Sequence, residues 1–358
     1  MEFGLFTISE KSPDMSYRQV VEDTLEQARV ADRTGYDVVF LGEHHFAPYG
    51  TLPDTMVFAG AVSQATERIK IGTAVIVPAF QHPVRIAEQA AMLDVMSGGR
   101  FILGIGRGYQ QREFEGFGVP QSESTARFRE ATEIIERLLA GETLTYEGRF
   151  WSCKDVSLSP KVEGDVPIYV AVSRTPENFA WAVEKSYGVM VGNPYAIDAG
   201  SGDGQQLYVD AQAQAGAAAD TSNTWGLMNS VFVDKDSSRA RDVFRKTWET
   251  GNEFLWKYAK VVEDGGDIPD DYKHYAGWYD WIQHAEYDKI FGNPWTLVGS
   301  PAEIVERLHA ISEMQSKYGP PMRNYILWMN RAGCLSQKDV LSSIELFASD
   351  VMPHVRDL

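Results

Sequence analysis

The stretch that decides the fold is residues 37–46, which read Asp-Val-Val-Phe-Leu-Gly-Glu-His-His-Phe. Its first half, Asp37–Leu41, is an apolar run without polar alternation, which is typical of a strand buried on both faces of a parallel sheet. Three polar residues, Glu43, His44 and His45, follow where that strand would end. In α/β folds the carboxyl ends of the strands are where ligands and chemistry lie. A single histidine would more often be structural here, whereas two beside an acid leave a structural and a functional role both open.

Strands of this kind alternate with helices along the whole chain. Over Tyr17–Thr34, for example, apolar residues share one helical face and Gly35 ends the helix. The predicted strands are residues 3–6, 37–41, 69–75, 100–106, 168–172, 189–191, 226–233 and 325–329. Eight strands separated by helices favour an α/β fold of the (β/α)8 TIM-barrel type over an open doubly wound sheet. We expect residues 1–358 to form one barrel domain.

Two segments depart from the alternation. Residues 141–167 contain two short strand-like runs around Glu147-Gly148, which predict a hairpin inserted on the surface. Residues 261–297 are too long for a plain connection and are rich in tyrosine and tryptophan, which argues against disorder. We expect a lid-like loop that covers an apolar ligand; a static aromatic cluster or a surface for a partner subunit is the alternative.

The composition is that of an ordinary globular protein, with 44% apolar and 23% charged residues among 358. Acidic residues outnumber basic ones 50 to 33, and the net charge of −17 disfavours nucleic acid or an anionic membrane as a partner. The first residues lack the features of a signal peptide, and no apolar stretch of about 18 residues occurs, so we expect a soluble cytoplasmic protein. The two cysteines, Cys153 and Cys334, are too few for a disulfide framework and lack metal-ligand spacing, so no metal is expected.

Two segments predict an anion site. Gly104–Gly108 follows a strand but lacks the third glycine of a dinucleotide fingerprint; its glycines instead allow close backbone approach, and Arg107 suits a phosphate. Residues 173–178 read Ser-Arg-Thr-Pro-Glu-Asn, where a strand ends and a helix begins, so N–H groups and hydroxyls converge beside Arg174. Thr175 could be only a helix cap and Arg174 a surface charge. Because both segments follow strands of one barrel, we expect a shared phosphate site.

Several motifs, none of them specific alone, occur together in this chain. They are Met1–Gly4, Glu43–Phe46, Gly72–Val77, His82–Arg85, Leu93–Phe101, Gly104–Gly108 and Ser349–Pro353. As a set they resemble the flavin-dependent luciferase-like monooxygenases, most closely the catalytic α chain of bacterial luciferase. The likeness is dense over residues 1–118 and thinner but collinear to the end.

The resemblance implies a (β/α)8 barrel that uses reduced FMN, supplied by a separate flavin reductase, and O2. A C4a-(hydro)peroxyflavin would then oxygenate a small apolar organic substrate. It also implies association as a homodimer through early barrel helices, and residues 56–62 form an unusually apolar segment there. Two alternatives remain: an F420-dependent oxidoreductase of the same superfamily, and a non-catalytic subunit like the luciferase β chain. Light emission is not implied.

Individual residues carry over from the family. His44 matches the catalytic histidine, and His45 is expected to be structural. Ala74-Val75 match the pair joined by a non-prolyl cis peptide behind the isoalloxazine ring. Arg107 matches an arginine on the FMN phosphate, and Thr175 and Asn178 match the hydroxyl pair at that phosphate.

The chain also departs from the family at its cofactor site. Thr125 stands where luciferase has a second phosphate arginine, and Arg127 is the candidate to replace it. Arg174 stands where luciferase has glutamate, which would strengthen anion binding. Gly106 stands where luciferase has a reactive cysteine, so the resemblance predicts extra room in the flavin pocket.

Overall fold

The computed structural model describes residues 1–48, 50–172, 175–192, 203–228, 230–262, 267–275, 286–329 and 335–358. Parallel strands close into a barrel in the order β1-β12-β9-β8-β7-β4-β3-β2. The barrel strands are β1 (Glu2–Thr7), β2 (Val38–Leu41), β3 (Lys70–Thr73), β4 (Phe101–Ile105), β7 (Ile168–Val172), β8 (Gly188–Val191), β9 (Thr224–Met228) and β12 (Asn324–Trp328). The predicted TIM barrel is confirmed, and each predicted strand contributes to it.

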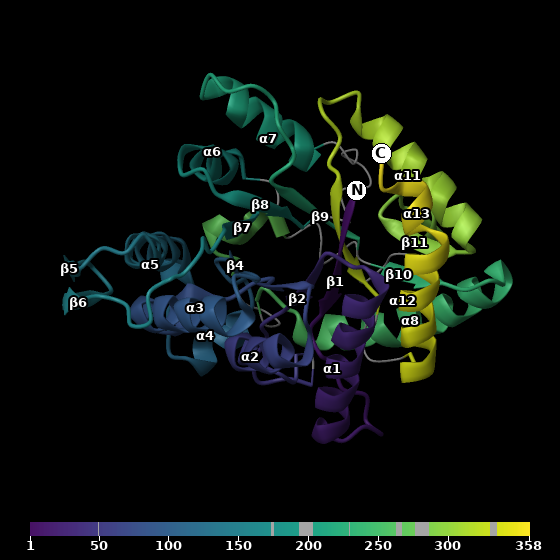
Figure 1. The fold of residues 1–358 in the computed structure, drawn as a ribbon, viewed down its shortest axis with the longest axis horizontal. Helices are drawn as coiled ribbons and strands as arrows, with labels where there is room; N and C mark the ends of the chain where they lie inside the picture. Colours follow the sequence, from purple (N-terminus) through teal and green to yellow (C-terminus); the bar gives the residue numbers. More distant parts are fainter. Residues whose placement is uncertain are drawn as a thin grey trace.

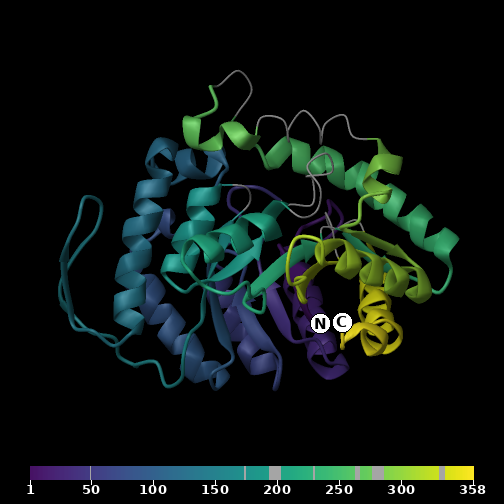
Figure 2. The same ribbon diagram turned by 90° about the horizontal axis from the view of Figure 1, so that it is seen from above.

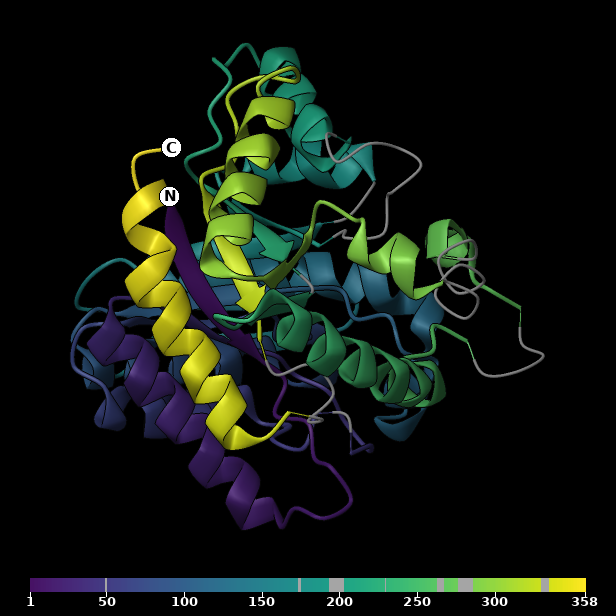
Figure 3. The same ribbon diagram turned by 90° about the vertical axis from the view of Figure 1, so that its right-hand side faces the viewer.

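Helices form an outer layer around the barrel (Figure 1). The longer ones are α1 (Tyr17–Thr34), α2 (Thr55–Ala65), α3 (Pro83–Ser97), α5 (Ser124–Leu139), α6 (Pro176–Glu184), α7 (Asp203–Gln214), α8 (Ser237–Tyr258), α11 (Pro301–Gln315) and α12 (Gln337–Asp350). The shorter ones are α4 (Gln111–Gly116), α10 (Tyr287–Phe291), α13 (Met352–Val355) and the 3-10 turns η1 (Pro78–Phe80), η2 (Gln121–Glu123) and η3 (Asp270–Tyr275). Helix α12 packs beside α1, and the two chain ends lie close together (Figure 3). None of the helices within the described ranges is long and apolar enough to cross a membrane.

The inside of the barrel is filled by large apolar side chains rather than hollow. The Phe40 ring packs edge-on against Trp225, with ring centroids 5.2 Å apart. Glycine on the neighbouring strands makes room for that ring, because a Cβ at Gly4 or Gly72 would lie 2.8 or 2.5 Å from it. A barrel plugged in this way leaves space for ligands only at the ends of its strands.

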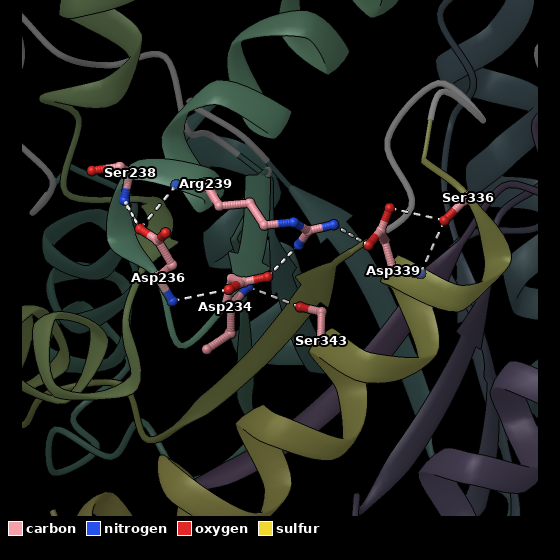
Figure 4. A network of polar contacts seen from close by, with 8 residues as sticks. Asp234, Asp236, Ser238, Arg239, Ser336, Asp339 and Ser343 are labelled. Carbon is pink, nitrogen blue, oxygen red and sulfur yellow. Dashed lines mark hydrogen bonds and ion pairs between the residues drawn. The ribbon is translucent and has the colours of Figure 1, made fainter.

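The predicted strand over residues 226–233 is wrong in one respect, because two strands occupy it. Its first part belongs to β9 in the barrel, whereas β10 (Ser230–Val233) pairs with β11 (Thr296–Gly299) in a separate parallel sheet. A continuous apolar run carries no signal that the chain changes sheets. The small sheet is tied to α12 by Val233 N–H, which donates to Ser343 Oγ at 2.9 Å. Arg239 strengthens this junction by bridging Asp234 and Asp339 (Figure 4).

The two predicted insertions have different outcomes. The hairpin is confirmed as β5 (Leu144–Glu147) and β6 (Ser152–Val156), which project away from the barrel (Figure 2). The lid-like segment contains η3, α10 and the start of β11, while its residues 263–266 and 276–285 lie outside the described part of the chain. Cys334 also lies outside it.

Candidate active site

A cavity of about 250 Å³ opens at the carboxyl ends of β2, β3, β4 and β7. Most of the predicted site residues line it, namely His44, Ala74, Val75, Arg107, Thr175 and Asn178. They come from segments far apart in sequence that meet because neighbouring parallel strands end at one rim. Arg174 lies outside the described residues, so its position is not assigned.

His44 is held at one ring nitrogen by residues that follow β4. Its Nδ1 lies 3.0 Å from Glu113 Oε1 and 2.9 Å from Gln110 Nε2. Glu113 is 1% exposed and also accepts the backbone N–H of His45 at 2.8 Å. A carboxylate only accepts hydrogen bonds, so the contact with Glu113 places a proton on Nδ1 and leaves Nε2 as the ring nitrogen that can accept one. An amide nitrogen only donates, so with this tautomer the Gln110 amide has to be turned with its oxygen toward Nδ1.

Glu113 is a site residue that the sequence did not reveal. It lies on α4, a helix of only six residues in a segment without strand or helix periodicity. In the sequence, Glu113 is only an acidic residue a few positions after Arg107. Acidic residues are too common at such positions for this one to be identified as a site residue. The fold gives this carboxylate its role by placing α4 against the end of β2.

His45 is not among the residues that line the cavity. Its Nε2 is 3.1 Å from Glu43 Oε1, and its ring packs edge-on against Phe117 and Phe80 at centroid distances of 4.7 and 5.8 Å. Burial raises the pKa of the Glu43 carboxyl, and the hydrogen bond from His45 opposes that rise. These contacts fit the structural role expected for His45.

The floor of the cavity is formed by the loop after β3. The Ala74–Val75 peptide is cis, as the resemblance predicted. The expectation of extra room at Gly106 is wrong, however, because a Cβ there would lie 2.4 Å from Val75 Cγ2. The Val75 methyl therefore occupies the space that a side chain at position 106 would need.

The polar end of the cavity combines a cation with a helix N-terminus. The Arg107 Nη1 donates to Thr125 Oγ1 at 3.2 Å, and its guanidinium lies 4.1 Å above the Tyr272 ring. Thr175 is the N-cap residue of α6, but its hydroxyl makes no capping hydrogen bond to the helix backbone. The first N–H groups of α6 and the Arg107 charge both favour an anion at this end.

On α5, the predicted Arg127 and a second arginine that was not predicted, Arg129, point in different directions. Arg127 pairs with Glu123 at 2.9 Å and lies 4.5 Å above the Phe150 ring, toward the hairpin, so the structure does not bring it to the cavity lining. Arg129 instead donates to Asn178 Oδ1 at 2.7 Å. Residues two apart on a helix differ by about 200° in direction, whereas residues four apart share a face. Arg129 therefore lies on the face of Thr125.

Comparison with known proteins agrees with this geometry. The family model described as luciferase-like monooxygenase matches residues 1–316. The alkanal monooxygenase alpha chain of the Kryptophanaron alfredi symbiont is 24% identical over 365 residues, covering 100% of this chain and 99% of that protein. Limonene 1,2-monooxygenase of Rhodococcus erythropolis is 25% identical over 357 residues, covering 99% of this chain and 86% of that protein.

Solved structures share the fold. Monooxygenase RslO1 from Streptomyces bottropensis has a TM-score of 0.83 at 26% identity, with 99% of both chains covered. The oxygenating constituent of 3,6-diketocamphane monooxygenase from Pseudomonas putida, in complex with FMN, has a TM-score of 0.78 at 20% identity, covering 99% and 98%. An F420-dependent secondary alcohol dehydrogenase has a TM-score of 0.72 at 20% identity, covering 99% of each chain, and these last two likenesses establish the fold alone. Since the family model spans most of the sequence and the relatives align over nearly all of it, the chain belongs to the luciferase-like monooxygenase family.

Proposed function

We propose that this chain is a monooxygenase that uses reduced FMN, delivered by a separate flavin reductase, and O2 to oxygenate a small apolar organic compound. The observation that carries the proposal is the make-up of the cavity. Apolar side chains of β7 and the Ala74-Val75 peptide form one wall, and Arg107 with the N-terminus of α6 forms the other end. This arrangement fits a flat apolar ring joined to a phosphate.

The residues at the polar end suit a phosphate monoester. We propose that Arg107, Thr175 and Asn178 bind it, because guanidinium, hydroxyl and amide groups all donate to phosphate oxygens. Their place at a helix N-terminus adds the favourable field of the helix dipole. Arg127 and Arg174 were also predicted to help; the structure supports a role for Arg129 in place of Arg127.

The apolar side of the site supports an apolar substrate. Ala74 and Val75 pack against the cluster inside the barrel that includes Phe6, Ile8 and Trp328. A compound between this cluster and the bound ring would be shielded from water. An oxygenation needs such shielding, because water promotes the loss of activated oxygen as H2O2 before it reaches the substrate. The names of the relatives, which act on alkanals and on limonene, agree with such a substrate class.

His44 is the proposed catalytic residue. When bound, reduced flavin supplies the electrons that activate O2. Glu113 fixes the tautomer of His44, so Nε2 can accept a proton from a reactant in the cavity or return one to it. The conjunction of His44 with Arg107 favours this function over that of a non-catalytic subunit.

Binding and turnover of the purified chain test the proposal together. FMN should bind, and Arg107→Ala should weaken FMN about tenfold while hardly affecting riboflavin, because only FMN carries the phosphate. With reductase-supplied FMNH2, the chain should consume O2 and oxidise members of a panel of aldehydes, ketones and terpenes. Turnover with reduced F420 but not FMNH2 would assign the chain to the F420-dependent branch. Failure to bind either cofactor would favour a non-catalytic subunit.

A further inference from the structure

Arg129 lies behind the polar end of the cavity and is tied to a residue that lines it. Its Nη2 donates to Asn178 Oδ1 at 2.7 Å, and its guanidinium stacks 3.5 Å from the centre of the Trp181 ring. The other terminal nitrogen, Nη1, is buried and has no hydrogen-bond partner among the described residues. Arg129 is thus fixed by a hydrogen bond and by ring stacking, while one of its buried nitrogens has no hydrogen-bond partner among the described residues. Such a group calls for an explanation beyond local packing.

Charged groups of both signs lie near Arg129: Glu130 and Glu133 line a neighbouring pocket with it, and Arg107 lies on the side of the cavity. Burial lowers the pKa of Arg129 to about 10; Tyr187 and Glu184 oppose the change, and the positive charge of Arg107 adds to it. Two guanidinium groups that disfavour each other in this way are both stabilised when an anion binds nearby. The positive charges of Arg107 and Arg129 therefore favour a ligand that carries a phosphate over a neutral one.

The hydrogen bond also fixes what Asn178 offers to the cavity. An amide side chain has one oxygen that accepts and one nitrogen that donates, and the two can exchange places by rotation. A guanidinium only donates, so the atom that faces Arg129 has to be the oxygen. Asn178 lines the cavity together with Thr175 and Arg107, and with its oxygen turned to Arg129 its amide nitrogen is the atom that can donate to a ligand there.

We propose that Arg129 is a positioning residue that makes the site select phosphorylated flavin over riboflavin. It acts through Asn178, which it holds with donors toward the phosphate, and through its positive charge. The inference rests on the FMN-dependent function proposed above and assigns the selectivity to a residue that does not itself line the cavity. Arg129, one helical turn after Thr125 on α5, would thus be the second arginine, besides Arg107, at the phosphate end of the cavity.

Flavin titrations test this inference directly. The dissociation constants of oxidised FMN and riboflavin are measured by fluorescence quenching for the wild type, Arg129→Met and Asn178→Asp. We expect Arg129→Met to reduce the preference for FMN about tenfold with riboflavin affinity kept, since charge-assisted contacts are affected selectively. Asn178→Asp keeps an acceptor for Arg129 but replaces the amide nitrogen with an oxygen, so it should also weaken FMN selectively.

Matched variants distinguish the possible failures. Arg137→Met, on the same helix but paired with Glu142 at the surface, should leave the preference unchanged. Riboflavin affinity reports whether each variant keeps a folded pocket. If the wild type prefers FMN and Arg129→Met does not alter that preference, the inference is overturned while the proposed function stands. Loss of the preference in Arg127→Met but not in Arg129→Met would give the role to Arg127. A wild type that binds neither flavin would overturn the proposed function and this inference together.

Discussion

At the scale of single residues, His44 is expected to govern oxygen transfer rather than flavin binding. It lines the cavity with Nδ1 held by Glu113, and proton transfer by a positioned imidazole contributes about 10²–10⁴-fold. His44→Ala should leave FMN affinity within a few-fold and divert O2 consumption from product to H2O2. Product formed and peroxide released per O2 consumed measure the effect.

His45→Ala is the matched comparison for His44→Ala. His45 packs against Phe80 and Phe117 and bonds to Glu43, so its loss should lower the melting temperature and leave coupling intact. A fully coupled His44→Ala beside an uncoupled His45→Ala would reverse the assignment and make His45 the catalytic histidine.

The sequence predicted residues whose position follows from a strand end, and it missed those placed by helix packing. His44, Ala74-Val75 and Arg107 directly follow β2, β3 and β4, so the topology alone brings them to one rim. Glu113 and Arg129 depend on which helix face meets the cavity, and this is set by tertiary contacts. The space at Gly106 was misjudged for a similar reason, because the Val75 methyl that fills it is distant in sequence.

At the scale of elements, the aromatic segment after α8 is linked to the polar end of the site. Tyr272, on η3, is fully buried and donates to the Gly108 carbonyl oxygen at 2.9 Å. Its ring also lies against the Arg107 guanidinium. The aromatic residues from which a lid over the site was predicted thus include Tyr272, which packs against Arg107, a proposed ligand of the phosphate. Periodicity could not reveal this contact, which joins residues more than a hundred positions apart.

The N-terminus of α11 gives a pH-dependent prediction. Burial alone would raise the pKa of Glu303, but hydrogen bonds from Ser237 and Ser300 and the charge of Arg241 outweigh it and lower the pKa to about 2. The folded state therefore releases this proton more readily than the unfolded chain. The stabilisation is complete above the ordinary glutamate value and is lost as the pH falls toward 2.

Glu303→Gln should accordingly lower the melting temperature at pH 7, and its difference from the wild type should shrink as the pH falls from 5 to 3. Differential scanning calorimetry across this range measures it. Glu306→Gln, one turn later on the same helix and exposed, serves as the control and should change little. If Glu303→Gln lowers the melting temperature equally at pH 7 and pH 3, the lost hydrogen bonds and not the carboxylate charge account for the lower stability.

At the scale of the whole molecule, exposed apolar side chains gather on α2 and α3. Val57, Met92 and Met96 are 70%, 50% and 41% exposed, and α2 contacts α3. The apolar segment 56–62 thus divides between the two sides of α2: Met56, Phe58, Ala59 and Val62 are buried, and Val57 faces outward. An apolar surface of this kind is characteristic of an association site.

We therefore expect a homodimer that forms through α2 and α3, in agreement with the family resemblance. Each chain carries a net charge of −17, so two copies repel each other at long range while their apolar faces attract at contact. Raising the salt concentration should strengthen the dimer, because it screens the repulsion and leaves apolar burial in place. Light scattering at micromolar concentration, at low and moderate salt, measures both effects.

Charge placed in the patch is the decisive variant. Val57→Glu and Met96→Glu should each shift the wild-type dimer toward monomer, because association would then bury a carboxylate without a partner. Tyr17→Glu is the control, since Tyr17 is an equally prominent exposed side chain, 65% accessible, on α1. A monomeric wild type would end the idea, and a dimer that resists both patch variants would place the interface elsewhere. Because the cavity lies at the strand ends and the patch on the outer helices, monomeric variants should retain FMN binding, so association and cofactor affinity can be measured independently.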